Sequence, residues 1–347
     1  MSSRLDSLKQ LTWMRARLYY REPAAIFWTF GFPLLLSVAL GLAFRNAKPE
    51  PVRVAVETSA ISAHALEILA GDPNVQAKEL DPVAAHEALR TGKVGLVVKA
   101  TGPAGYTYEY DPTRPESRLA RALVDDAIEK GEGRKDQATV TERVLTEAGS
   151  RYIDFLIPGL IGIGLMSSGL WGVGFALTEM RTKKLLKRLI ATPMRKADFL
   201  ASFLIVRSLF VIFEVPPLLL FGWLVFGVET RGSWLLLAGV TLVGTLTFAG
   251  LGLLIGSRTS SSEVVQGLIN FVSLPMYMCS GVFFSADRFP DWLQPVIRVL
   301  PLTALNDALR AVITDGAGLR VVALPIAILM GWGVASFAIA LRSFRWA

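Results

Sequence analysis

Six long apolar runs constrain this chain more than any other feature of its sequence. Each is close to the roughly 20 residues that a helix rising about 1.5 Å per residue needs to cross a bilayer. Only 19% of the 347 residues are charged, which is low for a soluble protein. We therefore predict a mainly α-helical, polytopic membrane protein with six transmembrane helices. The apolar runs are 23–44, 152–177, 199–226, 234–256, 264–284 and 319–341.

The segment 46–150 differs from the rest of the chain in composition and pattern. Acidic residues outnumber basic ones there, and strand-like stretches alternate with helical patterns. Such alternation is typical of a compact α/β unit. We predict an α/β domain over 46–150, followed by transmembrane helices two to six over 151–347. Its predicted strands are 51–57, 75–80, 94–99 and 106–110, and its predicted helices are 59–70, 82–90 and 115–130.

The first transmembrane helix, 23–45, is preceded by an amphipathic stretch, 1–22. Leucines recur at roughly helical spacing from Leu5 to Leu18, and lysine and arginine residues supply a basic face. This pattern predicts a helix that lies in the membrane interface. The alternative is an amphipathic helix that packs on protein.

The loop 179–198 sets the predicted orientation, because it holds seven basic residues and two acidic ones. Loops of this kind stay in the cytoplasm. With six spans, both termini then lie in the cytoplasm, and 46–150 is external. We expect a multi-pass protein of the inner membrane. The net charge of +7 favours anionic membrane lipids as partners. Nucleic acid is not expected, because no basic stripe lies on a soluble unit.

The sequence has no motif for nucleotide hydrolysis or metal binding. Gly92-Lys93 is the nearest approach to a Walker A motif, but it lacks the upstream glycine and the following Ser or Thr. His64 and His86 have no second ligand at metal-binding spacing. We therefore expect no catalytic residues, no metal and no cofactor in this chain.

Within the loop 179–198, apolar residues recur at helical spacing among the basic ones, and Thr192-Pro193 should end the helix. Such a helix could act as a lever between two spans, or it could anchor the loop to anionic lipid. Periodicity and charge do not choose between these interpretations.

Three stretches resemble ABC-2 type permeases: REPAAIFWTFGFPLLL (21–36), KLLKRLIATPM (184–194) and SGVFFSADRFPDWLQPVIRVLPLTALNDALR (280–310). The resemblance implies a permease subunit that works with a second permease, identical or paralogous, and with separate ABC ATPase subunits that bind ATP and Mg. It also implies that a cytoplasmic segment docks on the ATPase, helped by the N-terminal helix. Many members of the family have an acid-rich stretch before this segment, whereas here only Glu179 precedes the basic run. The residues that map onto the docking segment are Arg181, Lys184, Leu185, Leu186, Arg188, Leu189, Thr192 and Pro193.

The segment 285–316 contains three prolines and several charges, so it is not a complete span. Its apolar residues predict short re-entrant helices that dip into the outer leaflet, as the resemblance also implies. An external loop that lies in the interface is the alternative.

Two residues are candidates for a transport pathway. Glu214 is the one acid deep inside an apolar run, where a charge is costly, and Arg207 lies on the same helix face two turns earlier. Replacing Glu214 with Gln should relieve that cost. Asn270 is the second candidate. The expected function is outward movement of an amphipathic, drug-like or lipidic substrate. The alternatives are a membrane sensor with an external ligand-binding domain, or a proton-coupled transporter that uses Glu214.

Overall fold

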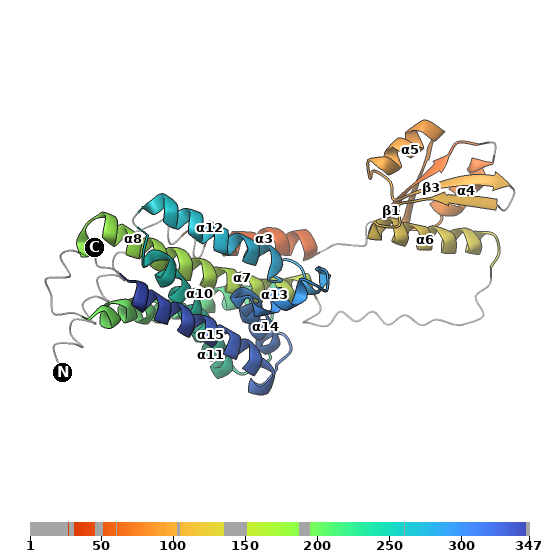
Figure 1. Cartoon of the computed structure of the whole chain (residues 1–347). Helices are drawn as coiled ribbons and strands as arrows, with labels where there is room; N and C mark the ends of the chain where they lie inside the picture. Colours follow the sequence, from red (N-terminus) through yellow and green to blue (C-terminus); the bar gives the residue numbers. More distant parts are fainter. Residues whose placement is uncertain are drawn as a thin grey trace. The chain divides into compact units, whose positions relative to one another are not determined.

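The computed structural model of the chain describes residues 27, 31–45, 51–59, 61–102, 105–134, 151–186, 195–259 and 261–344. The chain divides into two compact units (Figure 1). One contains the sheet between residues 51 and 134, and the other contains the helices on either side of it in sequence. The predicted interfacial helix, 1–22, lies outside the described residues.

The first unit is an α/β fold with a four-stranded sheet in the order β2-β1-β3-β4. Strands β1, β2 and β3 are parallel, and β4 pairs with β3 in the antiparallel direction. The predicted alternation of strands and helices is confirmed, and the boundaries differ by at most three residues. The elements are β1 (Val52–Glu57), α4 (Ser62–Ala70), β2 (Val75–Leu80), α5 (Pro82–Arg90), β3 (Leu96–Gly102), β4 (Gly105–Glu109) and α6 (Pro115–Gly131).

Helices cover both faces of this sheet. Val54, Val56 and Val98 pack on one face with α4 and α6, while Ala55 and Val97 pack on the other with α5. This follows from the two-residue period of a strand, which sends alternate side chains to opposite faces. Parallel strands joined by helices require such cover on both faces.

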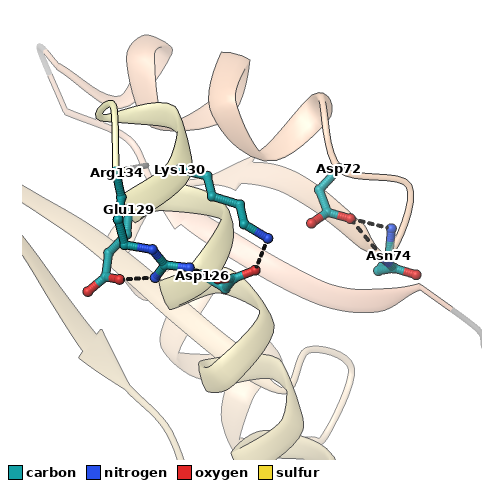
Figure 2. Close-up of polar contacts among 6 residues, drawn as sticks. All are labelled: Asp72, Asn74, Asp126, Glu129, Lys130 and Arg134. Atoms are coloured by element: carbon teal, nitrogen blue, oxygen red, sulfur yellow. Dashed lines mark hydrogen bonds and ion pairs between the residues drawn. The ribbon is translucent and has the colours of Figure 1, made fainter. Parts of the chain in front are cut away.

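Charged side chains fix the end of α6 (Figure 2). Lys130 Nζ donates to Asp126 Oδ2 at 2.7 Å, and the Arg134 guanidinium pairs with both Asp126 and Glu129. These groups are exposed, so the pairs contribute little to stability. The hydrogen bond from Lys130, followed by that from Arg134, lowers the pKa of Asp126. A separate turn is held by Asp72, whose Oδ1 accepts from the backbone and side-chain nitrogens of Asn74.

The second unit consists of helices and the loops between them, with no strand in the described residues. α7 passes without interruption through a π-helical segment, η2, into α8, and α10 continues through Pro216 and Pro217. Its elements are α3 (Phe32–Arg45), α7 (Tyr152–Gly169), η2 (Leu170–Phe175), α8 (Ala176–Thr182), α10 (Lys196–Phe226), α11 (Trp234–Gly256), α12 (Ser262–Cys279), η3 (Ala286–Arg288), α13 (Gln294–Val299), α14 (Pro301–Ile313) and α15 (Leu319–Ser343).

Four helical stretches of the described chain are long and apolar enough to cross a membrane. They are Tyr152–Thr182, Lys196–Phe226, Trp234–Gly256 and Leu319–Ser343. α3 has 14 described residues, and α12 has 18 with a more polar first turn that includes Glu263. The structure therefore shows a multi-helix apolar unit with four candidate spans, and the prediction of six is not confirmed.

α11 contacts α7, η2, α10, α14 and α15. It closely approaches the junction of α7 and η2, because a Cβ atom on Gly252 would lie 2.5 Å from the carbonyl oxygen of Gly169, the last residue of α7. By contrast, α10, α12 and α15 expose large apolar side chains such as Phe213, Phe271 and Leu324. Exposed apolar faces of this size suit contact with lipid.

Candidate functional site

The basic segment 179–198 begins as a continuation of the preceding helix. α8 extends to Thr182, five residues beyond the end of the predicted apolar run, and a turn follows at Lys183–Lys184. Lys184 has a φ of 56°, in the left-handed region that non-glycine residues rarely adopt. Helical geometry resumes at Leu185–Leu186, and α10 begins at Lys196. Arg188, Leu189, Thr192 and Pro193 lie outside the described residues.

The two leucines after the turn have different surroundings. Leu186 is only 1% exposed and packs with Phe199, Phe203 and Phe344. Leu185 is 37% exposed. The leucines predicted to form one apolar stripe therefore do not all face a partner protein, because Leu186 is part of the core of the helical unit. Leu185 is the described leucine of the segment that is available to a partner.

Arg181 points into the helical unit. Its Nη1 donates to the carbonyl oxygens of Gly256 at 3.0 Å and Thr259 at 2.6 Å, and its Nη2 donates to that of Ser257 at 2.7 Å. These carbonyls lie at the C-terminal end of α11, where helix geometry leaves carbonyls without intrahelical partners. The guanidinium carbon also lies 5.9 Å from the ring centroid of Phe344.

A buried ion pair connects Arg207 and Glu214 on α10. Arg207 Nη1 donates to Glu214 Oε1 at 2.6 Å, and Nη2 bonds to both Glu214 Oε2 and Ser168 Oγ. Both charged side chains are 6% exposed. Their spacing of seven residues, about two helical turns, puts them on one face. Glu214 is therefore neutralised within its own helix, and removing either partner would leave an uncompensated buried charge.

The ion pair also joins α10 to α7. Ser168 Oγ lies within hydrogen-bond distance of Glu214 Oε2, at 3.2 Å, and the neighbouring Ser167 Oγ lies 2.6 Å from the hydroxyl of Tyr277 on α12. Both serines lie in the last turn of α7, shortly before η2, and π-helical turns are frequent at functional sites. The sequence analysis missed Ser167, Ser168 and Tyr277. Hydroxyl residues in an apolar run are a weak sequence indication of a site, because such a hydroxyl often bonds within its own helix.

The two pathway candidates occupy different environments. Glu214 is buried against Arg207 and Ser168, whereas Asn270 lies on the exposed face of α12. Gln266, one turn before Asn270, is exposed on the same helix. Asn270 is thus available to a partner or to solvent, while Glu214 belongs to an internal network.

The segment 285–316 folds back into the helical unit. α14 is almost wholly buried and packs against α7, α11 and α15. Asn306 Nδ2 donates to the Ser280 carbonyl at 2.9 Å, and the Arg310 guanidinium carbon lies 3.6 Å from the ring centroid of Phe155. Leu305 packs against Gly244, in the middle of α11. A Cβ atom added to this glycine would lie only 2.7 Å from Leu305 Cδ1. α14 therefore packs alongside the candidate spans, and the re-entrant arrangement of 285–316 stays a prediction.

No group of three or more His, Cys, Asp or Glu side chains is arranged to hold a metal ion in the part of the chain that the structure describes. The polar contacts described above for the helical unit involve hydroxyls, a charge pair, the Asn306 amide and arginines bonded to backbone carbonyls. Such an arrangement can orient and connect helices.

Comparison with known proteins finds a match to the family model described as ABC-2 family transporter protein over residues 23–342. Among similar curated proteins, the ABC transporter G family member 20 of Dictyostelium discoideum is 26% identical over 185 residues, or 52% of this chain and 25% of that protein. The probable multidrug ABC transporter permease YbhS of Escherichia coli K12 is 24% identical over 163 residues, 47% of this chain and 43% of its own length.

The linearmycin resistance permease protein LnrN of Bacillus subtilis strain 168 is 26% identical over 184 residues. That alignment covers 50% of this chain and 45% of the relative. The chain thus spans between a quarter and a half of the length of these three curated relatives.

Proposed function

The chain belongs to the ABC-2 transporter family, and we propose that it is the permease subunit of an exporter driven by separate ABC ATPase chains. The family match over residues 23–342 is the observation that carries this proposal. ATP and Mg would be bound by the ATPase, since the sequence has no Walker A motif. Energy would therefore reach this chain through contact with its partner.

The proposed docking site is the basic segment 179–198. Its lysines and arginines would attract an acidic partner surface. Leu185, exposed directly after the turn at Lys183–Lys184, would provide an apolar contact. Arg188, Leu189, Thr192 and Pro193 stay predicted members of the same surface.

The proposed topology has six spans, with α3 and α12 as the additional two. The positive segment 179–198 and both termini would face the cytoplasm. The α/β unit would be external, and the protein would reside in the inner membrane. The exposed apolar faces of α10, α12 and α15 would contact lipid or a second permease, identical or paralogous.

The proposed substrate class is amphipathic, drug-like or lipidic, and the direction is outward. The support comes from relatives described as a multidrug permease and as a linearmycin resistance permease. Glu214 would contribute by holding α7 to α10. The ion pair with Arg207 disfavours the alternative in which Glu214 is a proton carrier, because its charge is already compensated.

Co-purification tests the proposal. The chain would be expressed with a Walker-containing ATPase encoded next to it and purified through a tag on the permease. The ATPase should co-purify with the native chain. Leu185→Asp should reduce its recovery about tenfold or more, since losing one buried leucine contact costs at least about 1.5 kcal/mol.

Leu119→Asp is the matched control, because Leu119 is an exposed leucine of α6 in the other unit. It should leave ATPase recovery unchanged. Leu186→Asp is unsuitable, because Leu186 is part of the core. If no ATPase co-purifies with the native chain, the exporter proposal is wrong and the sensor alternative gains support.

A further inference from the structure

We propose that Arg181 is a positioning residue that transmits movement of the segment after α8 to α11 and α12. The proposal rests on the proposed function, because that function supplies the movement. It also changes the role of Arg181, which the family resemblance assigned to contact with the ATPase. The side chain instead links two parts of this chain.

The first observation is the number of carbonyls that a single side chain binds. Arg181 donates to Gly256, Ser257 and Thr259, which end α11 and begin the turn toward α12. A guanidinium presents several donors in one rigid plane, so it can bind diverging carbonyls together. The C-terminal end of a helix also carries partial negative charge, which favours a cation there.

The second observation is backbone contact next to this cluster. A Cβ atom on Gly256 would lie 2.8 Å from the carbonyl oxygen of Gly174, and one on Gly174 would lie 3.1 Å from that of Gly252. No side chain therefore separates η2 from α11 at these positions. Close packing of this kind transmits displacement, because there is no flexible group to absorb it.

The third observation is that η2 lies between two polar attachments. Before it, Ser168 is bonded to the Arg207–Glu214 pair on α10. After it, Arg181 is bonded to the end of α11. Because Arg181 bonds α8 to the end of α11, movement of α8 would carry the α11–α12 turn with it.

Arg181→Met tests this role, because methionine keeps an apolar stem and removes the donors. In a chain whose Cys279 is replaced, spin labels at Thr182 and Glu263 report the distance across the Arg181 cluster. Both positions are exposed, one on α8 and the other in the first turn of α12. In the permease alone, the native distance distribution should be narrow, and Arg181→Met should broaden it.

A second label pair, at Leu209 on α10 and Gln266 on α12, reports movement of α12. Both residues are exposed. In the native complex with its ATPase, trapping with ATP and vanadate should shift this distance by about 1–2 Å or more, the scale of helix shifts in switching proteins. Arg181→Met should abolish the shift while the ATPase still co-purifies, and Arg181→Lys should restore part of it.

Arg258→Met is the matched control. Arg258 is exposed and lies in the α11–α12 turn, between two of the residues whose carbonyls Arg181 binds, and outside the proposed docking segment. The variant loses the same charge, but the shift should persist. An unchanged Thr182–Glu263 distribution in Arg181→Met, or a vanadate-driven shift equal to the native one, would overturn the role of Arg181. A native chain that never binds an ATPase would instead overturn the proposed function.

Discussion

The buried Arg207–Glu214 pair allows a quantitative test of how the helical unit is held together. Glu214→Gln removes one charge and leaves Arg207, of which only 6% is exposed, without its counter-charge. Breaking a buried pair in this way costs about 3–5 kcal/mol. For a unit of this size, each kcal/mol shifts the melting temperature by about 2–4 °C. We therefore expect Glu214→Gln to lower the melting temperature by about 6–20 °C.

The double substitution Arg207→Met, Glu214→Leu separates the charge effect from packing. It removes both charges and keeps apolar volume, so it should recover most of the loss, since such replacements of buried ion pairs are often neutral. Glu229→Gln is the control, because Glu229 is an exposed acid just after α10. It should change the melting temperature by less than about 2 °C, as surface substitutions do.

The assay is thermal unfolding of the purified permease in detergent, followed by loss of the monodisperse peak in size-exclusion chromatography. If Glu214→Gln melts within about 2 °C of the native protein, the pair does not stabilise the unit. If the double variant is as unstable as the single one, the cost lies in packing and the electrostatic reasoning fails.

Three further predictions concern packing, pH and orientation. Gly252→Ala should destabilise the helical unit by about 1–3 kcal/mol, because the added Cβ would meet the Gly169 carbonyl. Gly239→Ala, in open space on the same helix, is the control and should be neutral or stabilising. Equal melting temperatures of the two variants would refute this. In the α/β unit, hydrogen bonds to Glu109 and then to Glu57 raise the pKa of Lys99. Their stabilisation should be complete below about pH 10.4 and lost as pH rises through the raised pKa, and denaturant titrations of Lys99→Met should lack this loss. With Cys279 replaced, single cysteines at the exposed positions Ser59 and Arg118 should react with an impermeant thiol reagent in intact cells. A single cysteine at the exposed position Thr182 should react only after the cells are lysed. The reverse labelling pattern would invert the proposed topology.

Local sequence signals predicted much of the secondary structure. The run 234–256 coincides with α11, because Ser233 caps its N-terminus and polar residues follow Gly256. The strands of the α/β unit were visible as short stretches between turn residues, with β-branched residues in β1 and β3 and two tyrosines in β4. The run 152–177 was cut too short, since a hydropathy change at Glu179 ends an apolar stretch without ending a helix.

The contacts of the candidate site were less predictable, because they depend on partners far away in sequence. Periodicity placed Arg207 and Glu214 on one face, but it did not show the ion pair between them. The sequence therefore led to the expectation that Glu214→Gln relieves a cost, whereas the observed ion pair predicts a loss of stability. Ser168 lies 39 residues from Arg207, and no local pattern indicates that contact. Likewise, an apolar stripe shows that Leu186 must be covered, but it does not show that Phe199 of this same chain covers it.

The π-helical segment Leu170–Phe175 has a consequence for which sequence changes the protein can tolerate. A π-helical turn holds one more residue than an α-helical turn, so removing a residue there would restore ordinary helical winding. The five residues left would then wind through about the same angle at roughly 100° each, so α8 would keep its face relative to α7. A residue deleted from α8 before Arg181 would instead rotate Arg181 by about 100°, away from the carbonyls at the end of α11. Selection should therefore act on the length of α8 before Arg181 more strongly than on the length of the π-helical segment.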